Sequence, residues 1–224
     1  MNPYSHLALA AQLEADIHPA DRAEYYWGAV AADARYTART RRAQTHVPPE
    51  DFLQFFEKYP GWESFAQGYL VHLVTDLLKF RALLHQRILL WPLWLIFSGR
   101  FSTLLLETYY LERMPRRFEI SGLPNPVLRE LGISDPAARA FAETLRPFVA
   151  APSPEMALGF LRALRPGSRR VEMYARLIAL NERYPAWKSL LFRLADMDSL
   201  NRQMVNALRN DALLRQTVFR ALRQ

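Results

Sequence analysis

The sequence predicts an all-α protein built as a multi-helix bundle, and its composition supplies the main evidence. Half of the 224 residues are apolar, which is enough for a sizeable core, while only 8 are Gly. Ala, Leu and Arg are abundant and favour helices, whereas Val and Ile are few and rarely alternate with polar residues. The apolar residues instead recur with helical spacing between prolines and glycines, which mark the expected helix ends.

The first half of the chain predicts a series of helices with recognisable ends. Ser5 is suited to cap a helix over residues 6–15, and Pro19 is suited to begin a second helix that ends near Ala32. Further helices are expected over residues 34–45, 51–58, 62–85 and 101–113, with breaks at Pro48-Pro49, Tyr59-Pro60-Gly61, Pro92 and Gly99.

The chain changes character at residues 114–135, where three prolines and two glycines predict a connector with at most a short helix. This change predicts an N-terminal region over residues 1–113 and a helical C-terminal region over residues 114–224, which could pack on the first as one domain. Helices are expected in the second region over residues 136–147, 154–165, 168–183, 186–195 and 198–223, the last with a break near Asn210-Asp211.

Several classes of protein are excluded by what the sequence lacks. It has no cysteine, which excludes disulfides, thiolate metal sites and a cysteine nucleophile. The N-terminus has no basic segment followed by a long apolar run, so we expect no secretory signal and a cytoplasmic protein. The most apolar run, Ile88 to Phe97, is ten residues long and contains Pro92, which is too short to span a bilayer. It predicts either a buried helix or a partner-binding or membrane-surface patch containing Trp91 and Trp94.

The charge of the chain is concentrated near its C-terminal end. The net charge is +7, and residues 161–224 hold 13 basic and 5 acidic side chains. Such a face is either a solvated Arg-rich surface or a surface that attracts phosphates or anionic lipid. The aromatic residues that a platform for single-stranded nucleic acid needs are not interleaved there, so nucleic acid is not the expected partner. No feature of the sequence bears on the oligomeric state.

The most informative stretch for function is Gly68-Tyr69-Leu70-Val71-His72-Leu73-Val74-Thr75-Asp76. His72 and Asp76 are four residues apart in an apolar segment of helical periodicity, so they share one helix face. An imidazole nitrogen and a carboxylate oxygen together suit Zn²⁺ or a similar first-row ion. The alternative is a buried, hydrogen-bonded His–Asp pair that binds no metal.

Three further segments precede this pair in an informative order. They are an early His6, the segment Trp27-Gly28-Ala29-Val30-Ala31-Ala32-Asp33, and Ala43-Gln44-Thr45-His46. Over roughly residues 1–85 this order resembles the zinc-dependent phospholipase C family, whose all-helical fold is related to that of zinc-dependent single-strand nucleases. The resemblance implies that residues 1–113 form a zinc-binding domain holding one or two ions, with Mn, Fe or Ni as substitutes. The implied metal ligands are His6, Asp33, His46, His72 and Asp76, with Asp33 also a candidate catalytic base.

The sequence departs from the family pattern after Asp76. Larger members carry a further histidine soon after this aspartate and then an HxxxE pair, but this chain has no histidine after His85. We therefore expect fewer than three metal ions. Glu107 or Glu112 could supply a missing carboxylate ligand. His85 either lies at a helix edge, supports a metal ligand by contacting it, or binds a second metal. His18, before Pro19, is expected to be an exposed loop residue.

Two functions follow from these expectations. The first is a metal-dependent hydrolase that uses a metal-bound hydroxide to cleave a phosphoester, with a phospholipid head group among the substrates considered. The second is a non-catalytic protein, metal-binding or with a degenerate site, that acts through a partner or the membrane surface. The basic run Arg35, Arg39, Arg41 and Arg42 is either a solvated face or a site that holds a phosphate.

Overall fold

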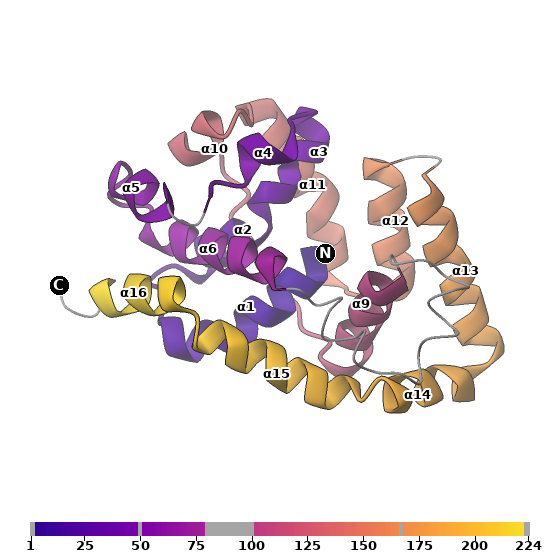
Figure 1. Cartoon of the computed structure of the whole chain (residues 1–224). Helices are drawn as coiled ribbons and strands as arrows, with labels where there is room; N and C mark the ends of the chain where they lie inside the picture. The colour runs from indigo at the N-terminus through magenta and orange to yellow at the C-terminus, as the bar shows by residue number, and fades with distance from the viewer. Residues whose placement is uncertain (1–2, 49–50, 79–100, 166–167, 222–224) are drawn as a thin grey trace.

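The computed structural model describes residues 3–48, 51–78, 101–165 and 168–221 (Figure 1). All the regular elements within these ranges are helices, which confirms the all-α prediction. Across the same ranges, no helix combines the length and the apolar character that crossing a membrane requires. The predictions for His85 and for the apolar run with Trp91 and Trp94 lie outside the described residues.

The helices follow one another along the chain, with one short 3₁₀ segment between α2 and α3. The first half contains α1 (Pro3–Ile17), α2 (Arg22–Ala31), η1 (Ala32–Ala34), α3 (Arg35–Ala38), α4 (Arg42–Thr45), α5 (Phe52–Glu57), α6 (Glu63–Leu77) and α9 (Phe101–Arg113). The second half contains α10 (Pro126–Glu130), α11 (Asp135–Ala150), α12 (Pro154–Leu164), α13 (Arg169–Arg183), α14 (Pro185–Leu194), α15 (Met197–Arg209) and α16 (Ala212–Ala221).

Two predicted helix starts were wrong. Ser5 does not cap α1 but lies within its first turn, where its hydroxyl donates a hydrogen bond to Glu107 on α9. The second helix begins at Arg22 rather than at Pro19, because the Asp21 side chain accepts a hydrogen bond from the Glu24 amide at 3.0 Å and caps the helix there. His18 has a positive φ of 51° and is exposed, as expected of a loop residue.

The predicted helix over residues 34–45 is also divided. Arg39 adopts the left-handed conformation with φ 54°, which ends α3 before α4 begins at Arg42. In contrast, the connector over residues 114–135 contains only the short α10, as predicted. The predicted break near Asn210-Asp211 is present, and Asp211 Oδ1 accepts hydrogen bonds at 3.0 Å from the amides of Leu213 and Leu214 at the start of α16.

Helices α2 and α6 pack closely against each other, and two glycines permit their approach. A Cβ atom on Gly28 would lie 2.0 Å from the Phe65 carbonyl oxygen, and one on Gly68 would lie 1.8 Å from the Tyr25 carbonyl oxygen. No larger residue fits at either position unless the helices move apart. The two glycines therefore bring the segment that ends in Asp33 against the helix that carries His72 and Asp76.

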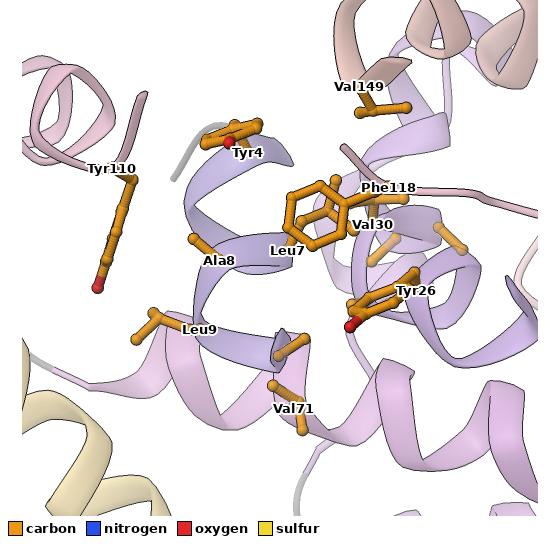
Figure 2. Packing of buried hydrophobic residues seen from close by; sticks show 14 of the residues in the cluster. Tyr4, Leu7, Ala8, Leu9, Tyr26, Val30, Val71, Tyr110, Phe118 and Val149 are labelled. Atoms are coloured by element: carbon orange, nitrogen blue, oxygen red, sulfur yellow. The ribbon is translucent and has the colours of Figure 1, made fainter. Parts of the chain in front are cut away.

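Helix α1 lies in the middle of the core and contacts α2, α6, α9 and α15 (Figure 1). Tyr4, Leu7 and Leu9 of α1 are fully buried among side chains from several other helices (Figure 2). The buried apolar residues form one cluster that extends from Tyr4 to Leu214 and so includes both halves of the chain. The domain boundary at residue 113 stays a prediction. Because α1 is central, His6 on this helix is also buried.

Candidate metal centre

Four separate segments supply the candidate donors. His6 lies on α1, Asp33 in η1 directly after α2, His46 just after α4, and both His72 and Asp76 on α6. The structure brings all five predicted residues together in two groups that could each hold a metal ion. His6, Asp33 and His72 form one group, and His46, His72 and Asp76 form the other, with the donor atoms of each group within 4.8 Å of one another.

The imidazole of His72 has a defined orientation. Its Nδ1 lies 2.9 Å from the carbonyl oxygen of Ala29 on α2, which can only accept, so Nδ1 carries the proton. The other nitrogen, Nε2, is then unprotonated and holds a free lone pair. Such a hydrogen bond to a backbone carbonyl is the usual way in which proteins orient a metal-binding histidine.

His6 and His72 are both fully buried, and their rings stack at a centroid distance of 4.0 Å. Among the described residues, neither ring nitrogen of His6 has a hydrogen-bond partner, nor does Nε2 of His72. Leaving buried polar atoms without a partner costs free energy, so each such atom calls for an explanation. A metal ion bound by these nitrogens would provide one.

Asp76 is the carboxylate on which the three histidines converge. Its Oδ2 lies 3.1 Å from Nε2 of His46 and 3.8 Å from Nε2 of His72, and its Oδ1 lies 3.5 Å from Nε2 of His6. The guanidinium of Arg42 also forms an ion pair with Oδ2. The Arg42 side chain is 52% exposed, so this side of the centre faces solvent.

Burial and charge set the protonation of these groups. Burial, followed by the proximity of His72, lowers the pKa of His6 well below its usual value, and burial also lowers the pKa of His72. Burial of the Asp76 carboxyl acts to raise its pKa, but the hydrogen bond with His46, with smaller electrostatic effects of the nearby His6 and His72 rings, outweighs this effect. The pKa of Asp76 therefore lies below its usual value. Two neutral imidazoles beside a carboxylate are the forms that bind metal ions.

Asp33 completes the deeper group. Its side chain is buried at the end of α2, and its Oδ1 lies 4.0 Å from Nε of Arg35 in the next turn. A carboxylate here adds a second negative charge to the centre, which favours a divalent cation.

The donor set determines what the site could hold. Imidazole nitrogen and carboxylate oxygen are standard ligands of Zn²⁺, and three protein ligands with one open position are typical of catalytic zinc. Both groups contain His72, whose one free lone pair can serve a single ion, so a second ion would have to be held by the other donors. The residues therefore fit a metal ion, and the fit does not distinguish zinc from its first-row neighbours.

The structure shows other contacts for the two glutamates considered as further ligands. Neither Glu107 nor Glu112 belongs to a donor group among the described residues. Glu107 instead accepts hydrogen bonds from the amide and hydroxyl of Ser5, and Glu112 pairs with Lys188 at 2.6 Å. Both carboxylates therefore have structural partners among the described residues.

Two features of the site were not predicted from the sequence. One is the hydrogen bond that orients His72. Its acceptor, the Ala29 carbonyl, is a main-chain atom and so leaves no signal in the sequence. The other is the ion pair of Arg42 with Asp76. The basic run containing Arg42 is evident in the sequence, but its partner comes from a distant helix.

The fold and the site together define an all-helical protein with a buried His/Asp group that could hold a metal ion. Comparisons of the chain with protein-family models, curated proteins and solved structures found no match.

Proposed function

We propose that this protein is a metal-dependent hydrolase of phosphoester bonds, with one or two zinc ions held by His6, Asp33, His46, His72 and Asp76. The observation that supports it best is the set of buried nitrogens on His6 and His72 without hydrogen-bond partners among the described residues, facing Asp76. The resemblance of residues 1–85 to zinc-dependent phospholipase C supports the choice of reaction, because the same five residues follow the order of that family's motifs.

The chemistry of the donors is consistent with hydrolysis. A bound zinc ion supplies Lewis acidity, which lowers the pKa of a coordinated water to about 7 and polarises a phosphoryl oxygen. The protein residues hold the ion in a site that is closed on the side of His6 and His72 and borders solvent at Arg42. Among the described residues, the Arg42 side is therefore the direction from which a substrate could approach.

Asp33 and Arg42 have separate roles in this proposal. The buried Asp33 carboxylate accepts the proton of the attacking water or, as a ligand, orients that water. Arg42 places a guanidinium at the edge of the centre, where it can form two parallel hydrogen bonds with phosphate oxygens. To do so it must release Asp76, which it can do once a metal ion neutralises that carboxylate.

The test is hydrolysis of a chromogenic phosphodiester, bis(p-nitrophenyl) phosphate, by protein loaded in turn with zinc, manganese, iron or nickel. We expect saturable activity with at least one metal, reduced at least about 100-fold in Asp33→Asn and His72→Asn. His18→Asn, which changes an exposed histidine, is the matched control and should retain full activity. Equal activity in all four proteins would exclude this centre as the catalytic site.

A second candidate function is favoured by the complete burial of His6 and His72. A metal ion enclosed by these rings would stabilise the helical bundle without reaching a substrate, and the protein would act through a partner or a membrane surface. Stoichiometric metal binding, higher thermal stability of the loaded protein, and no hydrolysis with any metal would support this alternative over the first.

A further inference from the structure

A second group of cations lies beside the candidate metal centre, around Tyr36. The guanidinium carbon of Arg35 lies 4.0 Å from the centroid of the Tyr36 ring, and that of Arg165 lies 3.7 Å from the same centroid. The two guanidinium carbons are therefore no further apart than these two distances combined. Arg35 comes from α3 and Arg165 from the end of α12, so the fold brings them together from distant parts of the chain.

The surrounding sequence adds positive charge at the same place. Residues 34–48 contain four arginines and no acidic residue, and so do residues 161–171. The contact of Arg165 with Tyr36 brings one arginine of the second segment to the first segment. Three further arginines of these segments, Arg39, Arg41 and Arg169, are exposed. Like charges repel, so a contact of this kind is stabilised when an anion binds between the segments.

An acidic group beside this pair belongs to the metal centre. Nε of Arg35 lies 4.0 Å from Oδ1 of Asp33, and among the described residues this buried Nε has no hydrogen-bond partner. Once Asp33 binds a metal ion, its charge is no longer available to neutralise Arg35. Metal binding would then strengthen the attraction of this pair for an anion.

We propose that Arg35, Tyr36 and Arg165 form a binding site for a terminal phosphate group. The inference rests on the proposed function and deepens it, since it places the anionic end of a substrate next to Asp33. Guanidinium groups bind phosphate oxygens through paired hydrogen bonds and also pack on aromatic rings. Arg35 donates from Nη2 to the Tyr36 hydroxyl, so Tyr36 helps to fix the position of this guanidinium. Two such groups and a nearby metal ion favour a phosphate with two negative charges over a singly charged diester.

The test measures the binding of inorganic phosphate by calorimetry at constant ionic strength. The protein is the His72→Asn variant without metal, so that phosphate cannot bind to a metal ion. We expect saturable binding that Arg165→Gln, added to the same variant, weakens at least about tenfold. Arg162→Gln removes an exposed arginine from the same helix and is the matched control, with an expected change of less than about twofold. Thermal unfolding of each variant checks that the fold is retained.

The outcomes separate this inference from the proposed function. If phosphate binding depends on Arg165 but the protein shows no hydrolysis, the phosphate site is supported and only the proposed hydrolase activity is rejected. Equal phosphate affinities in the Arg165→Gln and Arg162→Gln variants, or no saturable binding at all, overturn the phosphate site even if hydrolysis is observed.

Two sources of the phosphate are distinguished with vesicles. Binding of the protein to phosphatidylcholine vesicles that contain phosphatidic acid, displaced by inorganic phosphate and lost in Arg165→Gln, supports a lipid head group as the ligand. Phosphate binding without such vesicle binding supports a soluble phosphate ester.

Discussion

The imidazole rings of His6 and His72 stack at 4.0 Å with an angle of 16° between their planes, although they come from α1 and α6. Both rings are fully buried, and Nδ1 of His72 donates to the Ala29 carbonyl. The stacking places Nε2 of both rings near the Asp76 carboxylate, at 3.5 Å for His6 and 3.8 Å for His72, with no hydrogen-bond partner among the described residues. The proposed metal centre depends on this arrangement of α1, α2 and α6.

The close contact of α2 and α6 is predicted to control both stability and metal binding. Gly28→Ala places a methyl group against the Phe65 carbonyl, so the helices must separate. We expect a loss of about 3 kcal/mol in the free energy of unfolding and weaker zinc binding, because Ala29 moves away from His72. Urea denaturation and zinc titration measure the two effects.

Gly159→Ala is the matched control for this substitution. Gly159 lies within α12, and a methyl group added there would meet nothing within 4 Å, so alanine should stabilise the protein by about 0.5–1 kcal/mol. Similar effects of the two substitutions would contradict the close packing at Gly28.

Glu107 is predicted to hold the first turn of α1, which carries His6. Its Oε2 accepts hydrogen bonds from the Ser5 amide at 3.2 Å and from the Ser5 hydroxyl at 2.6 Å, in a fully buried position. Glu107→Ala should lower the free energy of unfolding by about 2–3 kcal/mol and weaken zinc binding. Glu112→Ala removes a partly exposed ion pair with Lys188 and should cost no more than about 1 kcal/mol. Urea denaturation of both variants measures the difference, and equal losses would contradict the role given to Glu107.

Arg42 is predicted to compete with the metal ion for Asp76. Because its guanidinium forms an ion pair with the carboxylate, Arg42→Gln removes a competing cation and should tighten zinc binding severalfold. Arg41→Gln changes an exposed neighbour and controls for the loss of one charge. Calorimetric titration with zinc provides the measurement. Unchanged or weaker binding in Arg42→Gln alone would show that the ion pair does not oppose the metal.

Stability at alkaline pH is predicted to depend on Tyr26. Burial and the hydrogen bond that its hydroxyl donates to Glu14 raise its pKa to about 12, from about 10 in an unfolded chain. Between these pH values the unfolded state has lost the proton and the folded state still holds it. The contribution of Tyr26 to stability is therefore complete below pH 10 and is lost as the pH rises towards 12.

The measurement compares the pH dependence of urea denaturation between about pH 9 and about pH 11 in wild type and Tyr26→Phe. The variant should lose stability less steeply across this range. Tyr184→Phe changes an exposed tyrosine and is the control. An equally steep loss in wild type and Tyr26→Phe would mean that the phenol is not held in its protonated form by the fold.

The sequence predicted the fold class and most helices because composition and helical spacing are local properties. It did not predict that Ser5 and Glu107 bond to each other, or that Asp21 rather than Pro19 starts α2. The first depends on packing between helices that are distant in sequence. The second depends on which of two nearby start signals, Pro19 as a first helical residue or Asp21 as a cap, begins the helix.

The grouping of the five candidate donors could be anticipated because His72 and Asp76 share a helix face and the other segments follow a family-like order. The Tyr36–Arg165 contact could not, because Arg165 carries no local signal that identifies its partner. Long-range contacts of this kind are set by the arrangement of α3, α11 and α12 rather than by any motif.

The most direct test of the metal centre is the zinc content of the purified protein after loading and removal of excess ion, measured by elemental analysis. Wild type and the control His18→Asn should each retain one or two zinc ions per chain, whereas His6→Asn and His72→Asn should retain little or none. Circular dichroism of each variant confirms that the helices are intact. If wild type retains no more zinc than His72→Asn, these residues do not form a metal centre.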